Sequence, residues 1–397
     1  MRLERPKEIE RFGSIRFGDL QRIFELDSGP DYGEPPTVTS AVMRVGHEAL
    51  ARVQQQMAII VPVKEERLKL IEGVICGIPH PCLVILVSNS PRVPVDRYAM
   101  EEDALQEFCH FTGKRAVIVH QKDPVMGEAF AGVGYKSLLE SGVIRDGKAE
   151  GMLLGTALAK LAGKKYVGFI DADNYFPGAV EEYVRAYSAV FATSDSPYTM
   201  VRIAWHSKPK IVESRLFFRK WGRTSAQTNQ FLNRLLSHYT GFETEIIKTG
   251  NAGEHAMTMD MAMTLDYSAG YSIEPYHIIN LIEQFGGIQE STLPEVMRHK
   301  LEVYQVESRN PHLHEAGDES HIDRMSFLAM QVLYHSSVCP PALRKELQAA
   351  MVKQGFIKER QRPPKPAYFP RLGSIDFDAF AKHIAGSPVG AALLGQE

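Results

Sequence analysis

The sequence predicts an α/β fold with a single, mainly parallel sheet. Four short strands that are apolar along their whole length alternate with helical segments between residues 57 and 170. Strands without polar alternation are buried on both faces, which is typical of a parallel sheet covered by helices on both sides. Small polar clusters follow these strands, and ligands bind beyond the carboxyl ends of such strands. We therefore expect a Rossmann-like sheet with a ligand site along one edge.

The elements follow from local patterns of apolar residues. Strands are expected at 57–63, 82–89, 116–120 and 166–170, and helices at 68–75, 96–112 and 148–162. The fourth strand runs directly into Asp171-Ala172-Asp173. Asn89, Gln121 and Lys122 stand at the ends of the second and third strands, so they are candidate ligand contacts.

The segments on either side show looser patterns. Gly29-Pro30 and Pro35-Pro36 interrupt the polar stretch 1–56, which predicts an irregular N-terminal arm. Residues 201–320 combine short pieces typical of antiparallel strands, beginning at 198–205 and 211–218, with helices. Apolar residues from 322 to 333 have helical spacing, and a short helix is expected near 376–384, so 321–397 forms a helical C-terminal region.

Composition excludes several classes of protein. The 397 residues contain 45 Lys and Arg against 48 Asp and Glu, a net charge of −3, so there is no global basic field for a nucleic acid. No apolar run approaches the roughly 18 residues of a membrane-spanning helix. The N-terminus lacks the apolar region of a secretory signal, and the four cysteines match neither a zinc site nor a disulfide scaffold. We expect a soluble, cytoplasmic protein with reduced thiols.

The motif Asp171-Ala172-Asp173 is the sharpest chemical feature. Two carboxylates spaced i, i+2 at the end of a buried strand can reach one hard cation, which a diphosphate also binds. Acidic residues after a strand also cap helices, which is the plain structural alternative. Three preceding strands with polar ends favour the metal and nucleotide interpretation.

The end of the first strand, VPVKEER, excludes two common nucleotide sites. A dinucleotide fold would place G-x-G-x-x-G there, and a P-loop would place G-x-x-x-x-G-K-[ST] there. Val-Pro-Val-Lys-Glu-Glu instead resembles the first strand end of A-type glycosyltransferases, which accept nucleotide-sugars. The resemblance implies that Pro62, Val63 and Glu66 contact the nucleotide; the alternative is a strand end followed by an acidic helix start.

Two glycine-rich elements are further candidates. Lys148, in the stretch GKAEG, can meet phosphate charge, and its neighbouring glycines permit close backbone approach. The stretch TGNAGEH precedes an apolar run at 256–265 that is expected to be helical, so its amides face a potential ligand. The resemblance to A-type glycosyltransferases implies that its Glu254 lies near the reacting carbon, and an ordinary glutamate at a helix start is the alternative.

Histidines and basic residues complete the set. Asn310-Pro311-His312-Leu313-His314 places two imidazoles in a loop, and His312 is preferred over His314 as a metal ligand. The segment 208–223 carries six basic residues and one acid, and could hold a phosphorylated acceptor. Surface histidines without a role, and a solvated basic face or an oligomer contact, are the respective alternatives.

As a set, the stretches IIVPVKEE, ILVSNS, VIVHQKDP, DGKAEGM, GFIDADNYFPGAVEEYV, VRIAWHSKPK and TGNAGEHAMTMDMAMTL resemble the mannosyl-3-phosphoglycerate synthase family of retaining A-type glycosyltransferases. The resemblance covers about 57–315. It implies transfer of α-mannose from GDP-mannose to the 2-hydroxyl of 3-phosphoglycerate, the first step in making the compatible solute mannosylglycerate. It also implies a divalent cation, with Mg²⁺ expected and Mn²⁺, Co²⁺ or Zn²⁺ as alternatives.

The sequence patterns and the resemblance together divide the chain into an N-terminal arm (1–56), a nucleotide-sugar-binding domain (57–200), an acceptor-binding region (201–320) and the helical region (321–397). The last region resembles no assigned family segment, and we expect its helices to pack in a homodimer. The implied catalytic residues are Asp173 and Glu254. The implied metal ligands are Asp171, Asp173 and His312. The implied donor contacts are Pro62, Val63, Glu66, Asn89, Gln121, Lys122, Lys148, Asp171 and Ala172, and the implied acceptor contacts are Lys208, Arg215, Thr224, Asn251, Ala252 and His255.

The mechanism and two rival functions remain open at this level. A double displacement needs a pair of carboxylates about 5 Å apart in glycosidases, and no clear pair is visible, so front-side attack is the working hypothesis. A sugar-phosphate nucleotidyltransferase would need a glycine-rich, arginine-containing loop after the first strand, which VPVKEER lacks. A non-catalytic subunit that binds a nucleotide-sugar is the other rival.

Overall fold

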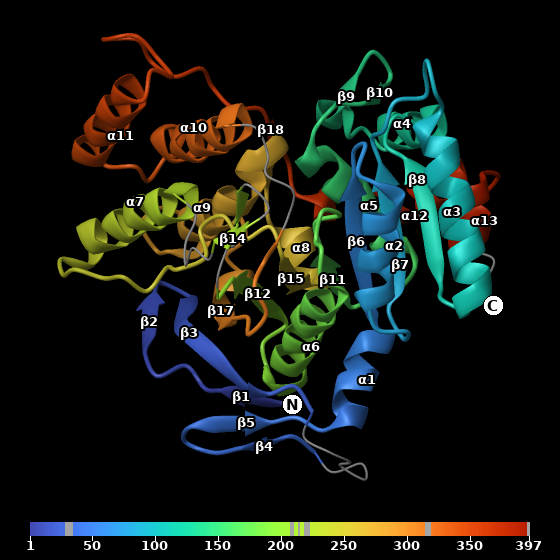
Figure 1. The fold of residues 1–397 in the computed structure, drawn as a ribbon. Helices are drawn as coiled ribbons and strands as arrows, with labels where there is room; N and C mark the ends of the chain where they lie inside the picture. Colours follow the sequence, from blue (N-terminus) through green and yellow to red (C-terminus); the bar gives the residue numbers. More distant parts are fainter. Residues whose placement is uncertain (28–34, 207–209, 213–214, 218–222, 314–318, 395–397) are drawn as a thin grey trace.

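The computed structural model describes residues 1–27, 35–206, 210–212, 215–217, 223–313 and 319–394. Its central sheet has the strand order β4-β5-β1-β3-β17-β12-β15-β11-β6-β7-β8, with β2 paired to β3 (Figure 1). The strands of this sheet are β1 (Arg2–Glu4), β2 (Ile9–Phe12), β3 (Ile15–Glu25), β4 (Thr37–Val38), β5 (Val42–Arg44), β6 (Met57–Val63), β7 (Leu83–Ser88), β8 (Ala116–His120), β11 (Tyr166–Phe169), β12 (Tyr198–Ala204), β15 (His255–Thr258) and β17 (Leu301–Glu307).

The directions of the strands place the functional loops at one edge. Strands β11, β6, β7 and β8 are mutually parallel, as are β12, β17 and β3. Strand β15 is antiparallel to both β11 and β12, so these two strands point the same way. The carboxyl ends of β6, β7, β11, β12 and β17, and the start of β15, therefore meet at a common edge. The predicted Rossmann-like fold class is confirmed.

Helices cover both faces of the sheet. They are α1 (His47–Gln55), α2 (Leu68–Gly77), α3 (Arg97–Thr112), α4 (Pro124–Gly132), α5 (Lys148–Leu161), α6 (Pro177–Thr193), α7 (Arg223–Thr240), α8 (Met259–Thr264), α9 (Ile273–Phe285), α10 (Glu319–His335), α11 (Pro341–Lys353), α12 (Phe377–Ile384) and α13 (Pro388–Leu394). Strand β6 shows the double cover directly: Ala58 and Ile60 belong to one hydrophobic core, whereas Ile59 and Val61 belong to the other. Burial on both faces explains why these strands lack polar alternation.

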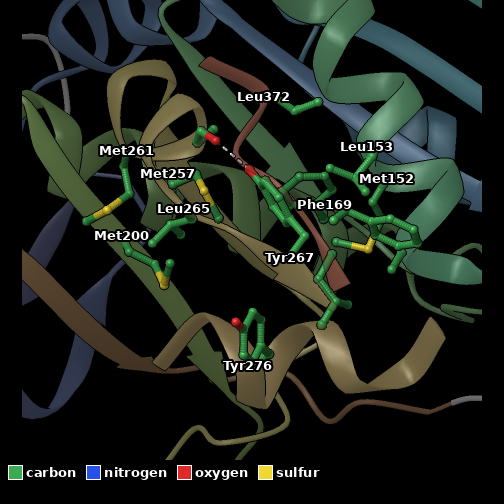
Figure 2. Close-up of a cluster of buried hydrophobic side chains, with 14 of the residues drawn as sticks. Met152, Leu153, Phe169, Met200, Met257, Met261, Leu265, Tyr267, Tyr276 and Leu372 are labelled. Carbon is green, nitrogen blue, oxygen red and sulfur yellow. Dashed lines mark hydrogen bonds between the residues drawn. The ribbon is translucent and has the colours of Figure 1, made fainter. Parts of the chain in front are cut away.

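The first core packs α5, α8 and α9 against the sheet. Figure 2 shows its central part, to which Met152 of α5, Phe169 of β11, Met257 of β15, Tyr267 and Tyr276 belong. The Tyr267 hydroxyl donates a 2.5 Å hydrogen bond to the carbonyl of Ala262, so its polar end is satisfied within the core. The second core packs α1, α2 and α6 on the other face. A rigid double-layered sheet is the support on which the edge loops are positioned.

The expectation of an irregular N-terminal arm is wrong. Residues 2–25 form β1, β2 and β3, and β3 joins the sheet by parallel pairing with β17. Ile15, Phe17 and Ile23 alternate along β3 and are buried, which is the period of a half-buried strand. The Gly-Pro and Pro-Pro pairs lie beyond residue 25, so they do not interrupt β1, β2 or β3.

A second correction concerns residues 255–265. The expected helix at 256–265 is replaced by β15, and the helix α8 begins only at Met259. His255 to Thr258 are buried because β15 lies between β11 and β12, and a short buried run fits an inner strand as well as a helix. The piece at 198–205 is antiparallel only toward β15, whereas it is parallel to β17. The hairpin of β13 (Lys210–Val212) and β14 (Arg215–Phe217) is antiparallel, as expected.

The remaining expectations for the helices agree with the structure. The predicted helices at 68–75, 96–112, 148–162 and 376–384 correspond to α2, α3, α5 and α12, and the C-terminal region contains α10 and α11 in addition. None of the helices in the described part of the chain is long and apolar enough to cross a membrane. The cysteines are free, and Cys82 and Cys339 are buried, whereas Cys76 is exposed.

Candidate active site

A cavity of about 440 Å³ opens at the carboxyl ends of β6, β7 and β11. Ligand pockets of this size hold small molecules, and this one lies where the strand order reverses between β6 and β11. Its lining includes the predicted donor contacts Pro62, Val63, Glu66, Asn89, Gln121, Lys148, Asp171 and Ala172, together with Asp173. Lys122 is exposed and does not line it. The fold thus brings together residues from four separate strand ends.

Lys148 is the central cation of the cavity. Its ammonium group lies 2.6 Å from Asp171 Oδ1 and 3.0 Å from Glu274 Oε1, and its side chain is only 13% exposed. Burial by itself lowers the pKa of a lysine, but these two carboxylates outweigh it and hold the pKa of Lys148 well above its usual value. Lys148 is therefore charged at any physiological pH and fixes the first carboxylate of the D-x-D motif.

Gly253 is packed against this ion pair. A Cβ atom at residue 253 would lie 2.5 Å from Asp171 Oδ2 and 3.4 Å from Lys148 Nζ. A real Cβ cannot sit that close to a carboxylate oxygen, so the loop before β15 can approach the ion pair only because residue 253 is glycine.

Replacing Gly253 with alanine is expected to lower stability by about 1–3 kcal/mol, as for other overpacked sites, and to lower activity by displacing Asp171. Urea unfolding and steady-state kinetics measure the two effects. Gly386→Ala is the matched control, because a Cβ there meets nothing within 4 Å. A Gly253→Ala protein with wild-type stability and kinetics would contradict the packing argument.

Glu254 lies beneath the cavity rather than on its surface. Its carboxylate is fully buried, and Oε1 accepts a 2.9 Å hydrogen bond from Asn174 Nδ2. Burial, with the negative charge of Asp171 nearby, raises the pKa of Glu254 to about 8. Glu254 lies close to the D-x-D motif, but its side chain does not line the cavity, and its role in the site stays a prediction.

His312 is held from several sides. Its loop is fixed by Glu182 of α6, which accepts hydrogen bonds from the backbone amides of Arg309 and Asn310, the latter at 2.9 Å. The ring stacks on Trp205 with centroids 4.5 Å apart, and Nδ1 lies 3.1 Å from Asn174 Oδ1. His312 is thereby brought next to the D-x-D motif, although 138 residues separate it from Asn174. His314 lies outside the described residues.

The chemistry of the predicted metal ligands fits a divalent cation, since Asp171 and Asp173 offer hard oxygens and His312 an imidazole. Within the described ranges no group of three His, Cys, Asp or Glu side chains is already gathered around one point. Asp171 Oδ1 is engaged by Lys148. The ligand set Asp171, Asp173 and His312 stays a prediction.

The predicted acceptor residues do not lie together in one place. Asn251 and Ala252 are buried in the loop before β15, and neither polar atom of the Asn251 side chain has a hydrogen-bond partner among the described residues. His255 is fully buried against Phe169 and His277, outside the cavity lining. Thr224 is buried in α7. Lys208 and the Arg215 side chain lie outside what the structure describes, so the basic segment is untested.

Several residues of this site have no strong sequence signal. Arg202 is fully buried in β12 and donates hydrogen bonds to the carbonyls of Thr249, at 2.9 and 2.8 Å, and of Glu274, at 2.9 Å, so it holds the glycine-rich loop and the start of α9. Glu274 itself comes from α9, about 100 residues after Asp171. Only Asn174, directly after Asp173, could have been found from its neighbourhood. Arg324 and Tyr271 line the cavity from α10 and the turn before α9.

Comparison with known proteins decides the family. The model of the mannosyl-3-phosphoglycerate synthase family matches residues 5–384. The chain belongs to this family. A relative named mannosyl-3-phosphoglycerate synthase from Pyrococcus furiosus is 43% identical over 386 residues, 97% of each chain. One of the same name from Aeropyrum pernix is 36% identical over 390 residues, 98% of each chain. The resemblance stated from the sequence is confirmed, and with it the class of glycosyltransferase enzymes.

Two solved structures are more distantly similar. The mannosyl-3-phosphoglycerate synthase from Rubrobacter xylanophilus is 16% identical, with a TM-score of 0.44 over 80% of this chain and 82% of that chain. The glucosyl-3-phosphoglycerate synthase from Mycobacterium tuberculosis in complex with Mn²⁺, UDP-glucose and glycerol 3-phosphate is 16% identical, with a TM-score of 0.48 over 86% of this chain and 96% of that chain.

Proposed function

We propose that this member of the mannosyl-3-phosphoglycerate synthase family transfers α-mannose from GDP-mannose to the 2-hydroxyl of 3-phosphoglycerate. The family match over nearly the whole chain supports the activity. The observation that connects it to this structure is the single cavity that unites the VPVKEE strand end, Lys148 and the D-x-D motif. The product, mannosyl-3-phosphoglycerate, would be the precursor of the compatible solute mannosylglycerate.

The donor would lie across the ends of β6 and β11. Pro62, Val63 and Glu66 line the part of the cavity assigned to the base and ribose, and Asn89 and Gln121 close it from the next strands. Gln121 is held by hydrogen bonds of 2.6 and 3.1 Å to the carbonyls of Arg145 and Gly147, so the stretch before α5 is pinned to the pocket. Lys148 and the D-x-D motif would face the diphosphate.

The divalent cation, expected to be Mg²⁺, would be held by Asp171, Asp173 and His312. When bound, it would stabilise the negative charge that develops on the leaving diphosphate. Lys148 supplies a second, fixed positive charge beside Asp171. Both groups would act on the leaving group, where charge develops as the glycosidic bond breaks.

Burial of Glu254 supports front-side attack. A nucleophilic carboxylate must reach the anomeric carbon, but Glu254 is fully buried and does not line the cavity. The acceptor hydroxyl would instead attack on the face that the diphosphate leaves, and its proton would pass to the departing phosphate oxygen. Glu254→Gln is therefore expected to keep measurable activity, and isolation of a covalent mannosyl-enzyme would disprove this mechanism.

The activity is tested by incubating the purified protein with GDP-mannose and 3-phosphoglycerate and assigning the anomer of the product by NMR. GDP release that requires both substrates, with an α-linked product, is the expected result. Pyrophosphate would indicate a sugar-phosphate nucleotidyltransferase, and donor binding without turnover would indicate a non-catalytic subunit. Either outcome would overturn the proposal.

Removal of divalent cations by a chelator is expected to lower transfer by at least about 10²-fold, the scale of losing one group that stabilises developing charge. Adding back Mg²⁺ or Mn²⁺ should restore it. The check is GDP release measured before and after chelation on one sample, with circular dichroism as a control for folding. Full activity in the chelated protein would contradict the predicted role of the cation.

The partners would be these two small anionic substrates, without nucleic acid or membrane. The near-neutral balance of charge supports this, because any anion must be held by local groups such as Lys148 rather than by a global field. We further propose that the enzyme is cytoplasmic and forms a homodimer through the C-terminal helices. Analytical sedimentation measures whether the protein forms a homodimer.

A further inference from the structure

We infer that Asn174 and Glu254 are positioning residues that fix His312 as the tautomer with its proton on Nδ1. This places the lone pair of the neutral imidazole on Nε2, the atom that would ligate the cation. The inference rests on the proposed metal role of His312 and deepens it. It assigns Asn174 a function and moves Glu254 from the reacting carbon to the support of the metal site.

The orientation of the Asn174 amide follows from its neighbours. Nδ2 lies 2.9 Å from the backbone carbonyl oxygen of Asp171 and 2.9 Å from Glu254 Oε1. A carbonyl oxygen can only accept a hydrogen bond, so the amide NH₂ group must face Asp171 whichever way the protons of Glu254 are arranged. The other end of the amide, Oδ1, then necessarily faces His312.

The tautomer of His312 follows from that orientation. Asn174 Oδ1 lies 3.1 Å from His312 Nδ1, and an amide oxygen can only accept. Nδ1 must therefore carry the proton. Glu254 Oε1, 3.8 Å from the same nitrogen, adds a favourable electrostatic contact to a protonated Nδ1. In metal sites, such partners orient a ligating histidine and tune its basicity.

The surroundings explain why the arrangement is rigid. Asn174 is 2% exposed and His312 is 4% exposed, so water does not compete freely for their hydrogen bonds. Trp205 stacks on the imidazole ring and Glu182 holds the backbone two residues before it. The plane and the backbone of His312 are thus fixed by packing, and Asn174 Oδ1 accepts a hydrogen bond from the proton-bearing Nδ1.

The tautomer can be read by NMR from protein labelled with ¹⁵N-histidine, without metal or substrate. His312→Gln identifies the signals. At mildly alkaline pH the wild type is expected in the Nδ1–H form, and Asn174→Ala should lose that preference. Glu254→Gln should keep it, because a glutamine oxygen can still accept from Asn174. An Nε2–H signal in the wild type, or an unchanged tautomer in Asn174→Ala, overturns the inference.

Cation binding gives a second readout. Mn²⁺ titrated by calorimetry in the presence of GDP should bind Asn174→Ala about 10–100-fold more weakly than the wild type, the usual effect of losing such a partner. Asn280→Ala is the matched control, since Asn280 is also buried and accepts a 3.0 Å hydrogen bond from the Asp266 amide, but lies in α9. Equal losses in both variants would overturn the inference.

The two readouts separate this inference from the proposed function. If Asn174→Ala does not fold, the wild-type tautomer alone still decides the question. If mannosyl transfer is not found but His312 is in the Nδ1–H form, the proposed function fails and the tautomer assignment stands. If transfer is found and the wild type is in the Nε2–H form, the function stands and the inference fails.

Discussion

Asp173→Ala is expected to abolish mannosyl transfer, with a loss in kcat of at least about 10³-fold, the upper scale for removing one group that stabilises developing charge. Asp173 lines the cavity at the carboxyl end of β11 and is the second carboxylate of the D-x-D motif. Its removal would leave the cation without one of three predicted protein ligands. The measurement is GDP release at saturating substrates.

A matched control separates this role from helix capping. Asp123 also follows a strand of the sheet, but its Oδ1 accepts a 2.8 Å hydrogen bond from the Val125 amide and caps α4. Asp123→Ala should cost about 0.5–2 kcal/mol of stability while transfer stays near the wild-type rate. If Asp173→Ala behaves in the same way, with activity within tenfold of the wild type, the metal role of Asp173 is wrong.

Lys148→Met is expected to produce the largest loss of stability, about 3–5 kcal/mol, together with loss of transfer. The substitution keeps much of the side-chain volume but leaves the partly exposed carboxylate of Asp171 and the buried carboxylate of Glu274 without their shared cation. Urea unfolding and kcat measure the two effects. Arg52→Met is the control, because the pair of Arg52 with Glu48 is about half exposed and should contribute less than about 1 kcal/mol.

The dependence on pH has a definite sign. The pKa of Lys148 is higher in the folded protein than its ordinary value of 10.5, so its contribution to stability is complete below about pH 10 and is lost only as the pH rises further. The stability deficit of Lys148→Met relative to the wild type should therefore be constant below about pH 10 and shrink at higher pH, where the wild type itself loses the charge of Lys148. A deficit independent of pH would contradict the ion-pair explanation.

The sequence is informative wherever a local pattern has one physical solution. The apolar strands at 57–63 and 166–170 can be buried only in a sheet covered on both faces, and the polar residues that follow them must share an edge. That reasoning placed Asn89, Gln121, Lys148 and the D-x-D motif in one site, and the structure brings them around a single cavity.

Prediction from local patterns failed where a buried run of residues is compatible with both a strand and a helix. Residues 255–258 are buried, and their position between β11 and β12 makes them a strand rather than the start of a helix. The N-terminal strands were missed because β3 is paired with β17, almost 300 residues away, and no local signal reports such a partner.

By itself, the sequence determined the class of fold, the family and the residues that carry charge at the edge of the sheet, because apolar periodicity and the spacing of Asp171 and Asp173 are local properties. Only the tertiary structure decided what surrounds those residues. Lys148 meets Glu274 from α9, and Asn174 meets Glu254 and His312 from two other segments. The roles of these side chains depend on burial and on hydrogen bonds between distant segments, which exist only after the chain has folded.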